Sequence, residues 1–215
     1  MNILCYGDSN TYGLTPDWRR RFPRNVRWPG RLQEILGASH YVVEDGLNGR
    51  CCTIRDTQRY GRAAIDFLPV ALECHNPLDY LVLMIGTNDC KPTKARTIRE
   101  LAAGMEELAK LALRMLPSSA KLLIVAPAPL RAVVLEKDPD FDSLSVQLSQ
   151  QSADAYREIA ERLGCLFLDA GSVTHTSDSD GEHLDEAGHA ALALAVAKII
   201  MENPVTCAPA DWSPF

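Results

Sequence analysis

The chain has 215 residues, of which 47% are hydrophobic and 23% are charged. This is an ordinary globular composition, and it argues against disorder, collagen-like repeats and coiled coils. The 22 Lys and Arg residues against 28 Asp and Glu residues give a formal net charge of −6. An acidic chain has no overall field that attracts phosphate backbones or anionic membrane surfaces. We therefore expect no nucleic-acid or membrane partner, and small neutral substrates stay open.

The seven cysteines are an odd number without a C-x-x-C pair. In a chain of this length they indicate neither a disulfide framework nor a zinc ribbon, and we expect reduced, partly buried thiols. The first residues carry no basic segment, and their apolar run ends at Asp8, too early for a signal peptide. No stretch approaches the length of apolar sequence that spans a membrane. These features predict a cytoplasmic protein.

Short apolar runs alternate along the chain with longer helical patterns, which is typical of βαβ units around a mainly parallel sheet. The apolar runs are compact and nearly continuous, as buried parallel strands are. In chain order, we expect strands at Ile3–Tyr6, Tyr41–Glu44, Tyr80–Ile85, Leu122–Ala126 and Cys165–Leu168. We expect helices at Pro29–Leu36, Arg62–Glu73, Thr97–Leu116, Leu144–Leu163 and Glu186–Met201.

Two connections, Thr11–Trp28 and Ala126–Ser143, are longer than usual, and such loops often bind ligands or form lids. No repeat, low-complexity run or linker divides the chain, so we predict one domain over residues 1–215 with a C-terminal tail at 203–215. The first connection carries a basic cluster, which we interpret as a solvated or inter-subunit face, with carboxylate recognition as the alternative. This cluster consists of Arg19, Arg20, Arg21 and Arg24.

Polar segments follow four of the five predicted strands. In open α/β sheets, ligands bind beyond the carboxyl ends of the strands, so these segments are expected to meet at one edge of the sheet. They are Gly7–Asn10, Gly46–Gly49, Gly86–Asp89 and a Ser-, Asp- and His-rich loop that contains Asp180 and His183.

Ser9 is a candidate nucleophile, although a serine hydroxyl is weak unless an oriented base lies beside it. Asp180 and His183 are three positions apart. A turn there lets the carboxylate receive one ring N–H while the other ring nitrogen faces Ser9. Acyl transfer also needs donors for the developing oxyanion, and the backbone N–H groups of Ser9 and Gly49 and the side-chain amide of Asn88 are suitable.

These blocks resemble those of the SGNH hydrolases, the GDSL esterase/lipase superfamily. The resemblance extends over almost the whole chain, in the same order and with similar spacing. It implies a flavodoxin-like three-layer α/β/α sandwich with a five-stranded, mainly parallel sheet. The matching residues are Gly7-Asp8-Ser9, Gly49, Gly86-Thr87-Asn88-Asp89 and Asp180-Gly181-Glu182-His183.

The resemblance also implies a role for each site residue. Ser9 becomes the nucleophile, His183 the base and Asp180 the residue that orients it. The oxyanion hole is implied to consist of the Ser9 and Gly49 backbone and the Asn88 side chain. Asp8 and Asp89 are implied to support the site by hydrogen-bonding to backbone.

Three further segments, Val26–Trp28, Glu44–Leu47 and Asp169–Ser172, look like the bacterial arylesterase branch of that superfamily. This implies a serine esterase for small acyl esters, with acyl transfer to alcohols as a further activity and a homo-oligomeric state. One residue departs from the pattern, because Asn10 stands where the GDSL block has Leu. We expect Asn10 to tune the pocket and substrate preference rather than catalysis.

Several alternatives remain open. A carbohydrate acetylesterase of the same superfamily fits the same residues, and a non-catalytic ligand-binding domain is a further alternative. Asp8 and Asp89 follow neighbouring strands, as in a metal-dependent phosphohydrolase, but the chain has no glycine-rich phosphate-binding motif. His189 competes with His183 as the base, although its place early in the last helix favours a helix-face or interface role. We predict no metal ion and no cofactor.

Overall fold

The computed structural model describes residues 1–205 of the chain. Its centre is a five-stranded sheet in the order β2-β1-β3-β4-β5, and all four neighbouring pairs are parallel. The predicted strands are confirmed, with ends that differ by at most two residues. They are β1 (Asn2–Gly7), β2 (Tyr41–Gly46), β3 (Tyr80–Met84), β4 (Lys121–Ala126) and β5 (Leu166–Asp169).

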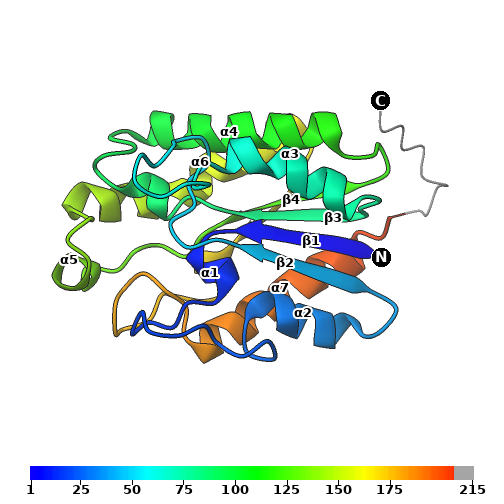
Figure 1. Cartoon of the computed structure of the whole chain (residues 1–215), viewed down its shortest axis with the longest axis horizontal. Helices are drawn as coiled ribbons and strands as arrows, with labels where there is room; N and C mark the ends of the chain where they lie inside the picture. Colours follow the sequence, from blue (N-terminus) through cyan, green and yellow to red (C-terminus); the bar gives the residue numbers. More distant parts are fainter. Residues whose placement is uncertain (206–215) are drawn as a thin grey trace.

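Helices cover both faces of the sheet, which gives the expected three-layer sandwich (Figure 1). On one face lie α3 (Ala64–His75), α4 (Ile98–Met115) and α6 (Ser143–Leu163). On the other lie α2 (Trp28–Leu36) and α7 (Glu186–Glu202). These five helices are the predicted ones, displaced by at most two residues at their ends.

The sheet separates two apolar cores. Along β3 every side chain is buried, and successive residues enter opposite cores. Leu81 and Leu83 pack in the core beneath α3, α4 and α6, whereas Val82 and Met84 pack in the core beneath α2 and α7. This two-sided burial explains why the strand sequence is continuously apolar instead of alternating.

The longer helices begin where the sequence supplies a cap. At the start of α4, Thr97 Oγ1 accepts the backbone N–H of Glu100, and the Glu100 carboxylate accepts the backbone N–H of Thr97. Such a capping box satisfies backbone donors that have no partner within the helix. The apolar face of α4 is buried, and Met105 lies in it with Leu108, so this methionine fills the core as expected.

Four short helical segments have no counterpart among the predicted elements. They contain only three or four residues, too few to produce a helical period in the sequence. Three of them lie at the carboxyl ends of strands, directly after β1 and β5 and shortly after β3. The segments are α1 (Ser9–Tyr12), a 3-10 helix at Asn88–Cys90, α5 (Val134–Lys137) and a 3-10 helix at Ala170–Ser172.

The basic cluster of the first long connection is directed at carboxylates of its own chain. Arg24 Nε lies 3.2 Å from Glu44 Oε1, and Arg21 also contacts Glu44. Arg27, outside the predicted cluster, approaches the same carboxylate at 2.7 Å. These contacts attach the connection to the carboxyl-terminal half of β2. The carboxylate that these arginines bind is therefore Glu44 of the same chain.

Two remaining expectations concern the membrane and the tail. None of the helices within residues 1–205 combines the length and apolar character that crossing a membrane requires. The predicted tail at 203–215 lies largely outside the described residues, which end at Val205.

The two faces of α7 provide a test of this packing. Leu192 is fully buried against the sheet and Leu194 is 62% exposed, only two positions along the same helix. We expect Leu192→Ala to lower the free energy of unfolding by about 2–5 kcal/mol, because it leaves a cavity in the core. The matched change Leu194→Ala should alter it by less than about 0.5 kcal/mol. Urea unfolding followed by circular dichroism measures both, and equal losses would contradict the assigned faces.

Candidate active site

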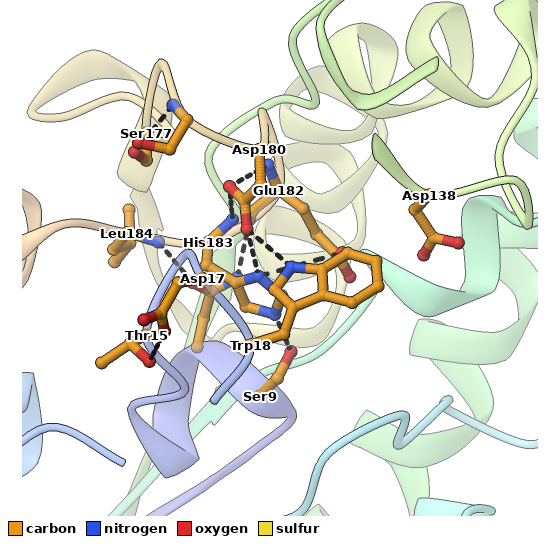
Figure 2. A network of polar contacts seen from close by, with 12 residues as sticks. Ser9, Thr15, Asp17, Trp18, Asp138, Ser177, Asp180, Glu182, His183 and Leu184 are labelled. Atoms are coloured by element: carbon orange, nitrogen blue, oxygen red, sulfur yellow. Dashed lines mark hydrogen bonds and ion pairs between the residues drawn. The ribbon is translucent and has the colours of Figure 1, made fainter. Parts of the chain in front are cut away.

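The predicted site residues come together at the carboxyl edge of the sheet. Ser9, Gly49, Asn88 and His183 line one cavity of about 310 Å³, and Asp180 lies directly behind His183 (Figure 2). Every predicted site residue is therefore within this cluster or in contact with it.

Ser9 is held at the first position of α1, which starts immediately after β1. The carboxylate of Asp8 accepts the backbone N–H of Asn10 and so caps this short helix. A Cβ atom on Gly46 would lie 2.0 Å from the backbone nitrogen of Tyr12, so only glycine at the end of β2 lets α1 pack there. Ser9 is thereby fixed by backbone contacts on two neighbouring strands.

A continuous chain of hydrogen bonds joins Asp180, His183 and Ser9. His183 Nε2 lies 3.0 Å from Ser9 Oγ, and His183 Nδ1 lies 2.6 Å from Asp180 Oδ2. The other carboxylate oxygen of Asp180 accepts the backbone N–H groups of Glu182 and His183 at 3.0 and 3.1 Å. The left-handed backbone of Gly181, with φ of 71°, allows the loop to fold back on Asp180 in this way.

The electrostatics of these hydrogen-bonded residues favour the ionised form of Asp180. Burial by itself would raise the pKa of Asp180, but the hydrogen bonds from His183 and the backbone outweigh it and bring the pKa below its usual value. Burial likewise opposes protonation of His183, yet the Asp180 and Glu182 carboxylates raise its pKa above 6.5. Asp180 therefore accepts the Nδ1 proton, which leaves Nε2 free to accept the proton of Ser9.

Three residues that line the cavity, Ser9, Gly49 and Asn88, carry N–H donors. Among the described residues, the backbone N–H groups of Ser9 and Gly49 have no acceptor. Asn88 Nδ2 donates one proton to the carbonyl of Arg50 at 3.3 Å, and its second proton stays available. Gly49 has a φ of 78°, a left-handed conformation that favours glycine. This arrangement suits an anionic oxygen next to Ser9.

Asp8 and Asp89 lie beneath the site and are buried. In each carboxyl group, one oxygen accepts a hydrogen bond from a backbone N–H. Asp8 Oδ1 accepts from Asn10, and Asp89 Oδ1 accepts from Cys52 at 2.9 Å. The second oxygen of each carboxyl has no partner among residues 1–205. Burial raises the pKa of Asp8 to about 7 and that of Asp89 to about 6.

Asn10, the residue that departs from the GDSL pattern, has a different role from the expected one of tuning the pocket. It is buried and is not among the residues that line the cavity. Its Oδ1 accepts the N–H of Leu184 at 2.9 Å, and its Nδ2 donates to the carbonyl of Glu182 at 3.2 Å. Asn10 thus fixes both neighbours of His183 to α1, a role that leucine cannot fill because it has no polar side-chain atoms.

Trp18, an aromatic residue of the first long connection, also contributes to the site. Its indole Nε1–H donates to Asp180 Oδ2 at 2.9 Å, the same oxygen that accepts from His183 (Figure 2). Its φ is 61°, a conformation that is rare for a bulky side chain. Thr15 and Asp17 hydrogen-bond across this turn and hold Trp18 over the site.

His189 does not take part in the cavity. It is buried at the start of α7, where its Nδ1 accepts the backbone N–H of Trp28 at 3.3 Å and Phe22 packs edge-on against its ring. Burial lowers its pKa to about 3, so it stays neutral. The expected helix-face role is confirmed, since His189 lies on the buried face of α7, where it attaches the first long connection to the core.

The remainder of the cavity is polar. It is lined by charged side chains, one aromatic and one aliphatic residue and two amides. No group of three or more His, Cys, Asp or Glu side chains suited to a metal ion occurs in the part of the chain that the structure describes. Besides the residues already placed, the lining contains Leu14, Asn48, Asp56, Gln58, Arg59, Lys91, Asp138, Asp140 and Glu182.

Residues 5–191 match the model of the GDSL-like lipase/acylhydrolase family. Solved structures with the same fold include an aryl esterase from M. smegmatis, 34% identical, with a TM-score of 0.87 over 94% of this chain and 98% of that one. A carbohydrate acetylesterase from Sinorhizobium meliloti is 30% identical, with a TM-score of 0.88 over 94% of this chain and 98% of that one.

A curated relative, an acetylxylan esterase from Xylanibacter ruminicola, is 23% identical over 226 aligned positions. The match includes 93% of this chain but only 43% of the relative, so the chain spans less than half of that protein's length.

The buried carboxyl of Asp8 predicts a pH-dependent stability. Because its pKa rises from 3.8 to about 7 on folding, the folded state binds the proton more tightly. The free energy of unfolding should therefore fall as the pH rises through this window. Asp8→Asn cannot ionise and should weaken this dependence.

Urea unfolding at pH 5 and pH 8 measures the difference for wild type, for Asp8→Asn and for the control Asp178→Asn. The side chain of Asp178 is 80% exposed, so its substitution should leave the pH dependence as in wild type. A dependence as steep in Asp8→Asn as in wild type would refute the assignment to this carboxyl.

Proposed function

The chain belongs to the GDSL-like lipase/acylhydrolase family, and we propose that it is a carboxylic ester hydrolase that forms an acyl-enzyme on Ser9. The observation that carries this proposal is the unbroken chain from Ser9 Oγ through His183 to the Asp180 carboxylate, beside three N–H donors. A nucleophile, an oriented base and an oxyanion site are the three parts that acyl transfer to serine needs.

Acylation starts when Ser9 Oγ attacks the carbonyl carbon of the ester and His183 Nε2 takes the hydroxyl proton. The negative charge moves to the carbonyl oxygen, which accepts hydrogen bonds from the N–H groups of Ser9 and Gly49 and from the Asn88 amide. Asp180 stabilises the imidazolium and keeps the ring in place. When the intermediate collapses, the bond to the alcohol breaks and His183 gives its proton to the departing oxygen.

Deacylation repeats these steps with water as the nucleophile. His183 takes a proton from water, the hydroxide adds to the acyl carbon, and Ser9 leaves with the proton from His183. An alcohol in place of water gives a new ester, so acyl transfer uses the same groups. Because His183 must be unprotonated when Ser9 attacks the ester, kcat/KM should rise with pH through its raised pKa.

We propose small acyl esters, with acetyl-type acyl groups, as substrates. The cavity of about 310 Å³ is at the small end of the range for ligand sites, and Leu14 and Trp18 form its apolar walls. The names of the relatives support this size class, since two of them act on acetyl esters of carbohydrates and one on aryl esters. Carbohydrate acetylesterase activity is therefore the alternative within the same reaction.

We further propose one catalytic domain without metal or cofactor, acting in the cytoplasm as a homo-oligomer. The six described cysteines are free thiols, in agreement with a reducing compartment. Tyr41, Tyr60 and Met201 are more than half exposed and are large hydrophobic side chains that contact between subunits would cover. Light scattering measures the oligomeric state.

Covalent labelling tests the nucleophile directly. An ester-like alkyl phosphonate should label wild-type protein at one site, and the label should be absent in Ser9→Ala, which loses ester turnover without unfolding. His183→Ala should label at least 10³-fold more slowly, because no base removes the Ser9 proton. His189→Ala serves as the comparison and should keep most of the labelling rate in the folded protein. Labelling in Ser9→Ala at the wild-type rate would reject the nucleophile.

Trp18 is proposed to position the catalytic aspartate. Its N–H withdraws charge from the oxygen of Asp180 that binds His183, so Trp18→Phe should leave that oxygen more basic. We expect the acid limb of the kcat/KM profile to move to higher pH and kcat to fall several-fold. A pH profile that matches wild type would mean that the indole N–H has no part in setting the pKa of His183.

A further inference from the structure

Glu182 occupies an unusual place between the two residues that act on Ser9. Its side chain is only 6% exposed, yet no N–H or O–H group of residues 1–205 donates to its carboxylate. His183 Nδ1 lies 3.9 Å from Glu182 Oε2, but the proton of that nitrogen goes to Asp180. The Glu182 oxygens are not among the side-chain atoms of residues 1–205 that are both closed to solvent and without a partner, so they are open to the cavity. Glu182 lines the catalytic cavity, so its partner can come from a bound substrate.

The position of Glu182 beside His183 places it near the alcohol part of an ester substrate. His183 must reach the departing oxygen to protonate it, so the alcohol part of an ester lies beside His183. The acyl oxygen lies with the proposed oxyanion donors, the Gly49 backbone and the Asn88 amide. Glu182 adjoins His183, and in Figure 2 its carboxylate points to the side where Asp138 lies. Glu182 therefore faces the alcohol part and not the acyl group.

Lys91 supplies the complementary donor in the same cavity. Its Nζ contacts Asp138 Oδ2 at 3.4 Å and Asp140 Oδ2 at 3.1 Å. An ammonium group has three protons, so one stays available for a ligand. A hydroxyl group both donates and accepts, and two neighbouring hydroxyls can bind a carboxylate and an ammonium together. Trp18, 41% exposed, adds an aromatic wall against which the carbon side of such an alcohol can pack.

The charges of the cavity favour a neutral ligand over a cation. The other carboxylates are already paired, Asp56 with Arg59 at 3.1 Å, and Asp138 and Asp140 with Lys91. A cationic ligand would have to approach both of these basic side chains.

We propose that Glu182 and Lys91 form a subsite for the hydroxyl groups of the alcohol part, so that the preferred substrates are acyl esters of polyhydroxylated alcohols. This inference rests on the proposed esterase function and adds the chemistry of the leaving group to it. A site built to hydrogen-bond a substrate hydroxyl discriminates strongly against the analogue without it, because its buried polar groups are then unpaired.

The test compares two acetyl esters that differ only in hydroxyl groups, 2,3-dihydroxypropyl acetate and propyl acetate. We expect kcat/KM of wild type to favour the dihydroxy ester by at least about tenfold. Glu182→Met has a similar size but no hydrogen-bonding oxygen and should bring the ratio towards one. Glu182→Gln keeps an acceptor and should retain part of the preference. Glu136→Met, an exposed site outside the cavity, is the matched control and should keep the wild-type ratio.

The outcomes separate the two levels of the proposal. If wild type hydrolyses both esters at similar rates, or if Glu182→Met and Glu182→Gln both keep the wild-type ratio, the subsite is refuted and the esterase stands. If wild type hydrolyses neither ester and the phosphonate does not label Ser9, both fail. A preference for 2-(trimethylammonio)ethyl acetate over its neutral isostere 3,3-dimethylbutyl acetate that is lost in Glu182→Gln would replace the hydroxyl subsite with a cation site.

Discussion

The parallel pairing of the five strands is the constraint on which the site depends. Since β1 lies between β2 and β3, with Gly7 opposite both Gly46 and Met84, the three strands end at the same level. Every loop that follows a strand must therefore leave at one edge, where β5 also ends (Figure 1). This geometry brings Ser9 and His183 within hydrogen-bond distance although 174 positions separate them.

The site itself is organised around one buried carboxylate. Asp180 accepts four hydrogen bonds, two from backbone N–H groups and one each from His183 and Trp18. These bonds hold its charge in a buried position, and the charge in turn fixes the ring of His183. Asn10 ties the same loop to α1 from the other side. Orientation, protonation state and loop position are thus set by a single polar network whose members depend on one another.

Much of the fold and of the candidate site could be predicted from the amino-acid sequence, because the patterns that indicate them are local. Each predicted strand is a nearly continuous apolar run, and the long helices carry helical apolar patterns, so their existence and order follow from the pattern. Asp180 and His183 lie in one turn, and Ser9 follows β1 directly. The short helices carry no period, and the roles of Trp18 and Asn10 depend on partners more than 160 positions away. No pattern in a single sequence pairs such residues.

The sequence by itself determined the fold class, the order of the strands along the chain and the residue types that can carry acyl transfer, because these depend on local hydrophobic period and on short motifs. Only the tertiary structure decided which polar atoms meet. It directed the indole of Trp18 to Asp180, turned Asn10 away from the cavity and left the carboxylate of Glu182 inside it. The physical reason is that a hydrogen bond needs a distance and a direction between particular atoms, and packing of the whole sheet and its loops fixes both.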